Sequence, residues 1–451
     1  LALCITPLRS FSAEIKKAAK DFCDGIGAPL EIDIRTGDTS TSARARQKRN
    51  MPALLITTPE SLHLLLAQKG YHKAFENLKA VIVDEWHELI GSKRGVQVEL
   101  ALSRLKTVSP GMRIWGISAT IGNLDEATDV LFGTGRSGMK TALIRANINK
   151  KIEVESILPD EVERFPWAGH LGTKLLQKVI PVIRNSKTTL IFTNTRSQTE
   201  IWFQKLHEVD PGLAGLVAMH HGSLDKKVRE WVEEALRDER LKAVVCTSSL
   251  DLGVDFTPVE SVIQVGSPKG VARFMQRAGR SGHQPGKVSR IYFLPTHSLE
   301  LIEAAALRDA INAGRIEARI PFVRSWDVLV QYLVTLSVSD GFKPDEILRE
   351  VKSTFSYSSM TEAEWGWILN YITLGSQSLY AYDEFKKVEI GADGVFRIAN
   401  RRLAMYHRMS VGTIVSDAVM RVKYLSGGNI GTIEEWFISR LKPGDVFWFA
   451  G

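Results

Sequence analysis

The stretch Val81-Ile-Val-Asp-Glu-Trp-His87 decides the fold of this sequence. Its apolar, β-branched start predicts a buried strand, and two adjacent carboxylates follow at the strand's end. Ligands of open α/β sheets bind at the carboxyl ends of the strands. Asp84 suits a Mg²⁺ ion, and Glu85 suits polarising a water that attacks a γ-phosphate. The alternative is a helix that begins with acidic residues, which a helix N-terminus favours.

Similar apolar runs alternate with amphipathic stretches on both sides of this motif, which predicts an α/β fold with helix-covered parallel sheets. The first series has predicted strands at 1–5, 53–57, 80–83 and 113–118, with helices at 14–22 and 61–66. The second has predicted strands at 189–192, 216–219, 243–246, 261–265 and 289–293, with helices at 198–206 and 226–236. Residues 159–172 suit a linker.

The pattern changes after about residue 301. Helices are predicted at 325–336, 345–352 and 361–374, followed by strands at 386–390 and 395–399 around a Gly391-Ala-Asp-Gly394 turn. Three helices and a hairpin are typical of a winged helix, and the same order also fits a generic small α+β domain. A β-rich piece is expected after Arg401.

Composition narrows the classes of protein. The 451 residues carry 58 Lys and Arg against 51 Asp and Glu, for a net charge of +7, and 44% are hydrophobic. This excludes a disordered chain. The sequence contains no apolar run long enough to span a membrane. Three scattered cysteines argue against a disulfide scaffold or a Cys-rich zinc site, so a cytoplasmic location is expected. The basic excess indicates either solubility or a polyanionic partner.

Two further motifs accompany the carboxylate pair. Ser118-Ala-Thr120 ends another predicted strand, and Gln276-Arg-Ala-Gly-Arg-Ser-Gly-His283 follows much later. Arg277 and Arg280 are three residues apart, so a short helix puts both guanidinium groups on one face, where they suit phosphate oxygens. The alternative is a solvated basic turn.

Together these motifs resemble those of superfamily 2 DNA/RNA helicases. The ordered set is Thr6-Pro-Leu-Arg9, Thr36-Gly37, Thr58-Pro-Glu60, 84–87, 118–120, Ile191-Phe-Thr-Asn-Thr-Arg196, His220-His-Gly-Ser-Leu224, 246–256 and 276–283. Within that superfamily the chain is similar to the Lhr type, and residues 84–97 are most similar to the ligase-associated DEXH-box branch. The resemblance implies two RecA-like parallel-sheet motor domains at 1–148 and 149–300, a winged-helix domain at 301–400 and the start of a β-rich domain at 401–451.

The resemblance also implies roles for single residues, with ATP and Mg²⁺ as cofactors. Asp84 and Glu85 bind Mg²⁺ and activate water, and His87 with Ser118 and Thr120 links the nucleotide state to the grip on the strand. Gly253 and Asp255 approach the nucleotide. Arg277 and Arg280 reach its phosphates, with Arg280 as the arginine finger, and Gln276 supports the coupling.

Nucleic-acid contacts are expected from hydroxyl, amide and guanidinium groups near strand ends, which bind phosphates without reading bases. These residues are Thr6, Arg9, Thr36, Thr58, Asn194, Thr195, Arg196, Thr247 and Ser248. The Ser and Thr side chains among them equally suit helix capping.

The resemblance implies ATP-dependent 3′-to-5′ movement on single-stranded DNA, in DNA repair. It also implies a DNA ligase and a nuclease of the same repair system as partners. No membrane partner is expected. The alternatives are an RNA or RNA–DNA hybrid helicase, and a non-catalytic nucleic-acid-binding scaffold. A metal-dependent nuclease needs a second carboxylate cluster beside Asp84 and Glu85, and the sequence shows none at useful spacing.

Three other features favour structural roles. Arg44, Arg46, Lys48 and Arg49 indicate a solvated helix face rather than a DNA track. The pair His220-His221 is expected to be structural rather than metal-binding. Trp365 and Trp367 are expected in a core.

The sequence contains no Gly-x-x-x-x-Gly-Lys-Ser/Thr segment, which a working motor of this type needs for its phosphates. We therefore expect the chain to be an internal piece of a longer protein, inactive alone. We also expect its first sheet to carry unpaired backbone groups and to fold poorly.

Overall fold

The chain forms two compact units. The computed structural model describes residues 1–119, 121–134, 140–145, 151–158, 172–251, 259–282, 288–375, 386–412, 419–426, 429–434, 442 and 444–446. Unit 1 consists of Leu1–Ala142 and Ala318–Ile414, and unit 2 of Leu143–Glu317 and Val415–Gly451.

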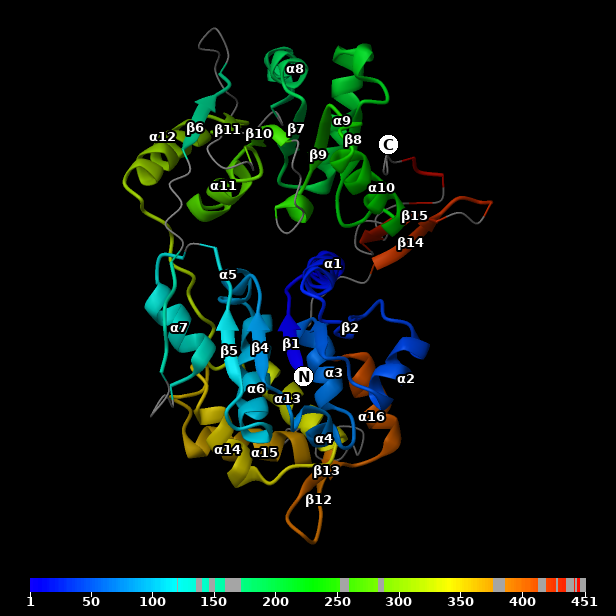
Figure 1. The fold of residues 1–451 in the computed structure, drawn as a ribbon, viewed down its shortest axis with the longest axis vertical. Helices are drawn as coiled ribbons and strands as arrows, with labels where there is room; N and C mark the ends of the chain where they lie inside the picture. The colour runs from blue at the N-terminus through cyan, green and yellow to red at the C-terminus, as the bar shows by residue number, and fades with distance from the viewer. Residues whose placement is uncertain are drawn as a thin grey trace. The chain divides into compact units, whose positions relative to one another are not determined.

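Unit 1 is built on a five-stranded parallel sheet in the order β2-β3-β1-β4-β5 (Figure 1). Each of the five described strands is hydrogen-bonded to its neighbours in this order. The unpaired backbone groups expected in the first sheet therefore do not lie between two of these strands. The strands are β1 (Ala2–Ile5), β2 (Ile32–Arg35), β3 (Leu54–Thr57), β4 (Ala80–Val83) and β5 (Arg113–Gly116). The helices are α1 (Arg9–Gly25), α2 (Thr41–Arg49), α3 (Pro59–Leu66), α4 (Tyr71–Phe75), α5 (Trp86–Leu89), α6 (Lys93–Val108) and α7 (Leu124–Phe132).

Residues 318–414 of unit 1 contain the predicted three helices and hairpin. One continuous hydrophobic core joins their apolar side chains to those beneath the first sheet. The elements are α13 (Trp326–Val338), α14 (Pro344–Lys352), α15 (Glu362–Leu374), β12 (Val388–Ile390) and β13 (Phe396–Ile398), with β12 and β13 antiparallel.

One expectation for this region holds in part and another is wrong. The β structure expected after Arg401 occurs at 419–423 and 429–434, but helix α16 (Arg401–Met409) comes first, and the Asn400 side chain caps it by accepting from the Leu403 N–H. Trp365 is buried as expected, whereas Trp367 is 58% exposed and stacks on Tyr371. The two tryptophans are two positions apart, so the helix turns them to different sides.

Unit 2 is built on a six-stranded parallel sheet in the order β6-β11-β10-β7-β9-β8. Its strands are β6 (Ile152–Ser156), β7 (Thr188–Phe192), β8 (Val217–His220), β9 (Ala243–Cys246), β10 (Val259–Val265) and β11 (Ser289–Leu294). Its helices are α8 (Leu176–Asn185), α9 (Arg196–Val209), α10 (Lys226–Arg237), α11 (Val271–Ala278) and α12 (Leu299–Asn312), with short 3₁₀ turns η1 (Thr173–Leu175), η2 (Pro211–Leu213) and η3 (Ser248–Leu250).

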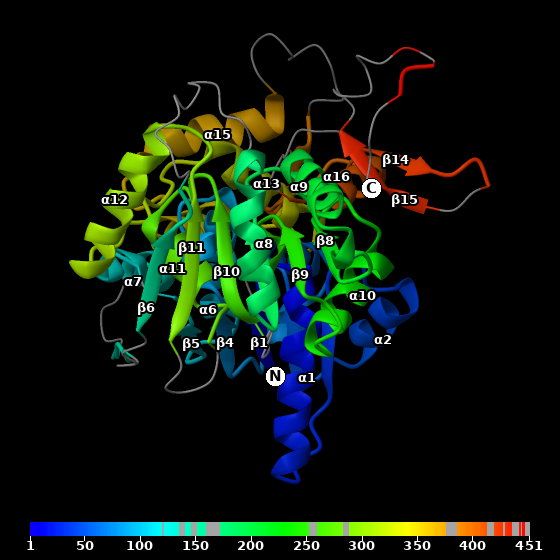
Figure 2. The same cartoon turned by 90° about the horizontal axis from the view of Figure 1, so that it is seen from above.

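Helices cover both faces of this second sheet (Figure 2). One hydrophobic cluster packs α8 and α9 against the sheet, and a separate cluster packs α10, α11 and α12. The antiparallel strands β14 (Val419–Lys423) and β15 (Asn429–Glu434) are also assigned to unit 2.

The α/β class with two parallel sheets is confirmed. The predicted strands occur within a few residues of their expected positions, and most of 159–172 lies outside the described residues. The predicted boundaries at 148, 300 and 400 stay predictions. In the described part of the chain, no helix combines the length and apolar character needed to cross a bilayer.

Candidate nucleotide and nucleic-acid site

The carboxylate pair lies at the carboxyl end of β4. The Asp84 N–H donates to the Ile5 carbonyl at 2.8 Å, which ties the end of β4 to β1. Burial raises the pKa of Asp84, and the backbone N–H of Glu85 opposes that rise. Glu85 itself adopts a left-handed backbone with φ of 47°, so the strand ends there and α5 begins at Trp86. A half-buried carboxylate with a raised pKa is suited to a cation such as Mg²⁺.

His87 connects this pair to the segment after β5. The Ala119 N–H donates to His87 Nδ1 at 3.2 Å, so that nitrogen carries no proton. Burial, together with the charge of Arg319, lowers the pKa of His87 to about 4. The imidazole is therefore neutral, and the 3.4 Å approach of Glu85 Oε2 to Nδ1 is not an ion pair. The structure thus brings together Glu85, His87 and Ser118-Ala119, whereas Thr120 lies outside the described residues.

A pair of hydrogen bonds between Asn123 and Arg319, which the sequence did not indicate, lies near the residues that follow Asp84. Arg319 and Asn123 exchange two hydrogen bonds: the Arg319 N–H donates to Asn123 Oδ1 at 2.8 Å, and Asn123 Nδ2 donates to the Arg319 carbonyl at 3.0 Å. Arg319 Nη2 lies 3.9 Å from Glu88 Oε1. A side chain at Gly91 would collide with the Ile320 carbonyl. The chain entering α13 is therefore fixed against the residues that follow Asp84.

The predicted contacts of unit 1 lie at the carboxyl ends of its strands. Thr6 and Thr36 are buried, and Thr58 caps α3 by accepting from the Ser61 N–H at 3.4 Å. Arg9 is exposed, and its Nη1 lies 3.1 Å from Asp38 Oδ1. Because parallel strands end at one edge, these side chains share the edge that carries Asp84.

In unit 2 the structure corrects the prediction for Arg277. Its guanidinium is buried, donating from Nε and Nη2 to Asp251 at 2.7 and 3.0 Å and from Nη1 to Gln264 at 2.5 Å. It also lies over the Phe192 ring. A side chain with three donors engaged inside its own unit does not present its charge to a phosphate. Asp251 and Gln264 explain this, because a buried cation requires compensating acceptors.

The other residues of this motif are placed differently. Gln276 and Arg280 are half-buried, in α11 and just after it. Gly253 and Asp255 lie outside the described residues. The N-terminus of α11 receives a carboxylate that the sequence did not reveal: the Ala272 N–H donates to Glu317 Oε2 at 3.0 Å and lies 3.2 Å from Oε1.

The remaining predicted contacts of unit 2 follow β7 and β9. Thr195 caps α9 by accepting from Gln198 N–H at 3.1 Å, while Asn194 Nδ2 donates to the Ser267 carbonyl at 2.9 Å. Arg196 and Ser248 are exposed, and Thr247 is half-buried.

The histidine pair is buried in the fold. His220 Nδ1 lies 2.7 Å from Ser249 Oγ, and burial lowers the pKa of His221 to about 4. Within the described residues, no group of three or more His, Cys, Asp or Glu side chains is arranged to hold a metal.

Comparison with known proteins identifies the family. The profile of the DEAD/DEAH box helicase matches residues 1–127, the helicase conserved C-terminal domain matches 173–284, and the winged helix domain of the large helicase-related protein matches 309–451. The ATP-dependent helicase Lhr-Core protein 2 of Thermococcus barophilus is 33% identical over 468 residues, which cover 100% of this chain and 54% of that protein. The chain belongs to the Lhr-type helicases.

Other Lhr helicases agree with this assignment. The Lhr helicase/uracil glycosylase of Escherichia coli is 31% identical over 78% of this chain and 26% of its own length. The structure of Mycobacterium smegmatis helicase Lhr bound to ssDNA and AMP-PNP superposes with a TM-score of 0.80 at 26% identity, over 94% of this chain and 55% of that one. The Lhr-type chain described here spans about half the length of the curated relatives it matches. These relatives do not confirm the ligase-associated branch, which stays a prediction.

Proposed function

We propose that the chain belongs to an ATP-dependent helicase or translocase that moves 3′ to 5′ on single-stranded DNA and acts in DNA repair. The observation that carries the proposal is the hydrogen bond from Ala119 to His87, beside Asp84 and Glu85 at the end of β4. It connects the residues suited to phosphoryl transfer with a second strand end. The Lhr of M. smegmatis, whose fold this chain shares, was solved with ssDNA and AMP-PNP.

In this proposal Asp84 holds Mg²⁺ and Glu85 orients the attacking water. The magnesium ion supplies charge neutralisation at the nucleotide phosphates. Arg280, Gln276, Gly253 and Asp255 act on the nucleotide from unit 2. Arg277 acts as a positioning residue for α11, since its guanidinium is engaged by Asp251 and Gln264.

Nucleic acid is gripped through its backbone at the strand ends. Ser118 and Thr120 transmit the nucleotide state, and the phosphate contacts in each unit are Thr6, Arg9, Thr36, Thr58, Asn194, Thr195, Arg196, Thr247 and Ser248. Such groups do not read bases, so the choice of DNA over RNA rests on the structure of M. smegmatis Lhr, which was solved with ssDNA. A DNA ligase and a nuclease are proposed as partners in the same repair system.

The test uses the full-length protein. Steady-state ATP hydrolysis is measured with no nucleic acid, with single-stranded DNA and with RNA of the same length. We expect DNA to stimulate hydrolysis most and Glu85→Gln to abolish it while DNA binding persists. Equal stimulation by RNA would overturn the DNA preference, and full activity of Glu85→Gln would overturn the assigned chemistry.

A further inference from the structure

A basic hollow of about 350 Å³ lies in unit 1 among α2, the end of α3 and α4. Five cationic side chains line it, and its lining contains no Asp or Glu. They are Arg35, Lys48, Arg49, Lys69 and Lys73. None of them is among the strand-end residues assigned above to nucleic acid, so the hollow is a separate feature of the unit.

Arg35 makes this hollow more than a patch of surface lysines. Arg35 is only 8% exposed, yet among the described residues its guanidinium bonds only to neutral oxygens, from Nη1 to Gln47 Oε1 at 3.2 Å and to the Arg44 carbonyl at 3.4 Å. Burial, together with the nearby charge of Arg44, lowers the pKa of Arg35 to about 10. A buried cation without a counter-charge is costly and calls for an anion.

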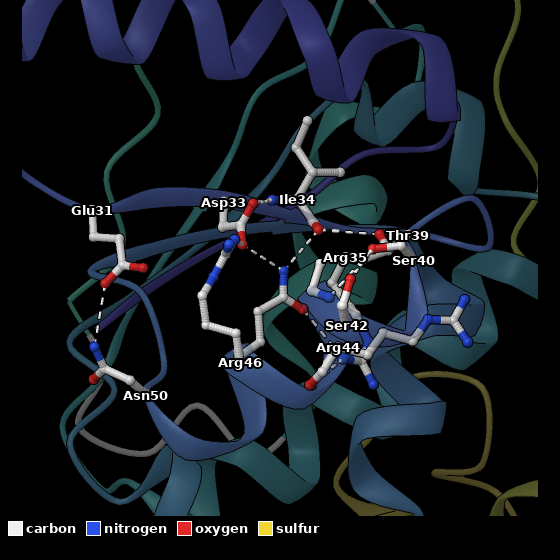
Figure 3. Close-up of polar contacts among 12 residues, drawn as sticks. Glu31, Asp33, Ile34, Arg35, Thr39, Ser40, Ser42, Arg44, Arg46 and Asn50 are labelled. Atoms are coloured by element: carbon white, nitrogen blue, oxygen red, sulfur yellow. Dashed lines mark hydrogen bonds and ion pairs between the residues drawn. The ribbon is translucent and has the colours of Figure 1, made fainter.

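Asp33, a neighbouring carboxylate, is already engaged by cations that do not line the hollow. Asp33 accepts from Arg46 at 2.7 Å (Figure 3) and from Gln47 at 2.8 Å, and Lys16 Nζ lies 3.4 Å from its carboxylate. Burial would raise the pKa of Asp33, but the hydrogen bonds from Gln47 and Arg46 lower it to about 2, so it stays charged and paired. Asp340 accepts from the backbone N–H of Gly70, which is one of the lining residues.

The five cationic side chains are therefore available to bind an anionic ligand. In the described part of the chain none of them forms an ion pair with a carboxylate. Guanidinium and ammonium groups converging from three elements suit the oxygens of phosphate groups. Tyr71 also lines the hollow, and its hydroxyl accepts from Arg104 Nε at 2.6 Å.

We propose that this hollow binds phosphodiester groups of a nucleic-acid strand, as a second contact apart from the strand ends of unit 1. The proposal rests on the proposed function only in its choice of nucleic acid as the polyanion. The cluster 44–49, interpreted above as a solvated helix face, then contributes Lys48 and Arg49 to a binding site.

The test compares two double variants of the full-length protein. Lys69→Gln/Lys73→Gln removes two lining charges, and Lys20→Gln/Lys79→Gln removes two exposed lysines elsewhere in unit 1. Oligothymidylate affinity is measured by fluorescence anisotropy over a series of KCl concentrations. Each lost phosphate contact reduces the slope of log K against log salt by roughly 0.7 for a single strand, so the first pair should reduce it by about 1.4. The control pair should leave it unchanged, and equal slopes in both would overturn the proposal.

A lysine footprint gives a second readout that needs no variant. Bound oligothymidylate should protect Lys69 and Lys73 from acylation, while Lys20 and Lys79 react as before. Protection by inorganic tripolyphosphate but not by oligothymidylate would assign the hollow to a small anion and overturn the proposal. This outcome is independent of Glu85→Gln, so failure of the proposed ATPase would be recognised separately.

Arg35 is tested by Arg35→Met. The change removes a buried charge that has no counter-charge, so we expect an unchanged or higher melting temperature together with a smaller salt slope. A lower melting temperature with an unchanged slope would make Arg35 a structural residue and overturn its place in the site.

Discussion

His87 Nδ1 accepts a hydrogen bond from the Ala119 N–H at 3.2 Å, and this bond joins the His87 side chain to the segment that follows β5. It requires a neutral imidazole, which the low pKa of His87 provides. The His87 side chain thus links the two strand ends in addition to two backbone hydrogen bonds, from the Ile117 N–H to the Val83 carbonyl and from the Trp86 N–H to the Ile117 carbonyl.

Replacing that acceptor should uncouple hydrolysis from nucleic-acid binding. His87→Ala leaves the Ala119 N–H without its acceptor, a loss of about 1–3 kcal/mol, or roughly fivefold to over a hundredfold in stimulation. His87→Gln supplies a carbonyl oxygen and should retain part of it. ATP hydrolysis of the full-length protein with and without single-stranded DNA measures the effect. Equal losses in the two variants would contradict the role of the acceptor.

Arg277 and Asp251 should stabilise unit 2 rather than bind nucleotide. Removing one partner of a buried pair costs about 3–5 kcal/mol, so Arg277→Met should lower the free energy of unfolding by that order. The double variant Arg277→Met/Asp251→Leu should lose less than Arg277→Met alone. Urea denaturation measures both. Arg240→Met serves as the control, because Arg240 pairs with Asp238 at the surface. A stable Arg277→Met with weakened ATP affinity would restore the original prediction.

Glu99 should make unit 1 less stable as pH rises. Burial raises its pKa to about 8 from 4.5, although the Ser356 hydroxyl and N–H donate to it at 2.6 and 2.9 Å. Its contribution is fully present below pH 4.5 and is lost as pH rises through about 8. Glu99→Gln should flatten this fall in urea denaturation at a series of pH values. Glu389→Gln, in the exposed hairpin, should leave the slope as it is, and a steeper fall in Glu99→Gln would contradict the assignment.

Buried histidines should give the opposite trend on the acid side. Burial lowers the pKa values of His87, His221 and His407 to about 4 from 6.5. Their contribution is present above pH 6.5 and is lost as pH falls toward 4. His407→Gln should reduce the loss of unit 1 stability in that range, measured by thermal melting, relative to the exposed control Glu389→Gln. Melting curves identical to the parent at every pH would contradict it.

Glu317 should stabilise the start of α11. An acidic group at a helix N-terminus contributes about 0.3–1 kcal/mol, so Glu317→Gln should lower the free energy of unfolding of unit 2 by that amount, less at high salt. Glu303→Gln in α12 is the control, because Glu303 is exposed. A loss that is independent of salt would indicate packing instead of charge.

Most strands of the two sheets were predictable because they are apolar runs that end in polar motifs, whereas β2 and β6, which carry charged residues at alternate positions, were missed. Helix α6 was also missed, although 11 of its 16 residues are buried. Its polar residues Gln97, Glu99 and Arg104 look solvent-facing in sequence. Their partners Gln331, Ser356 and Glu350 lie more than 230 residues away, and only the folded chain shows them.

The site divides in the same way. Asp84, His87 and Ser118 were found because they stand in short motifs after strands. Asn123 and Arg319 were not, since the Asn123 side chain meets the Arg319 backbone across 196 residues, and those backbone atoms carry no sequence signal. The prediction for Arg277 failed for a related reason. Its three-residue spacing from Arg280 indicates a shared helix face, but the sequence does not show that Asp251 and Gln264 accept hydrogen bonds from Arg277 inside the unit.

At Glu85, the left-handed backbone lowers the stability of the protein, while the carboxylate serves the proposed ATP hydrolysis. A non-glycine residue there costs roughly 1–2 kcal/mol, so Gly or Asn would suit the backbone better than Glu does. Drift toward a more stable protein would therefore remove the very carboxylate that the proposed reaction depends on. In a relative that no longer needs ATP hydrolysis, we expect Glu85 to be among the first residues replaced, because Gly or Asn fits the left-handed backbone better.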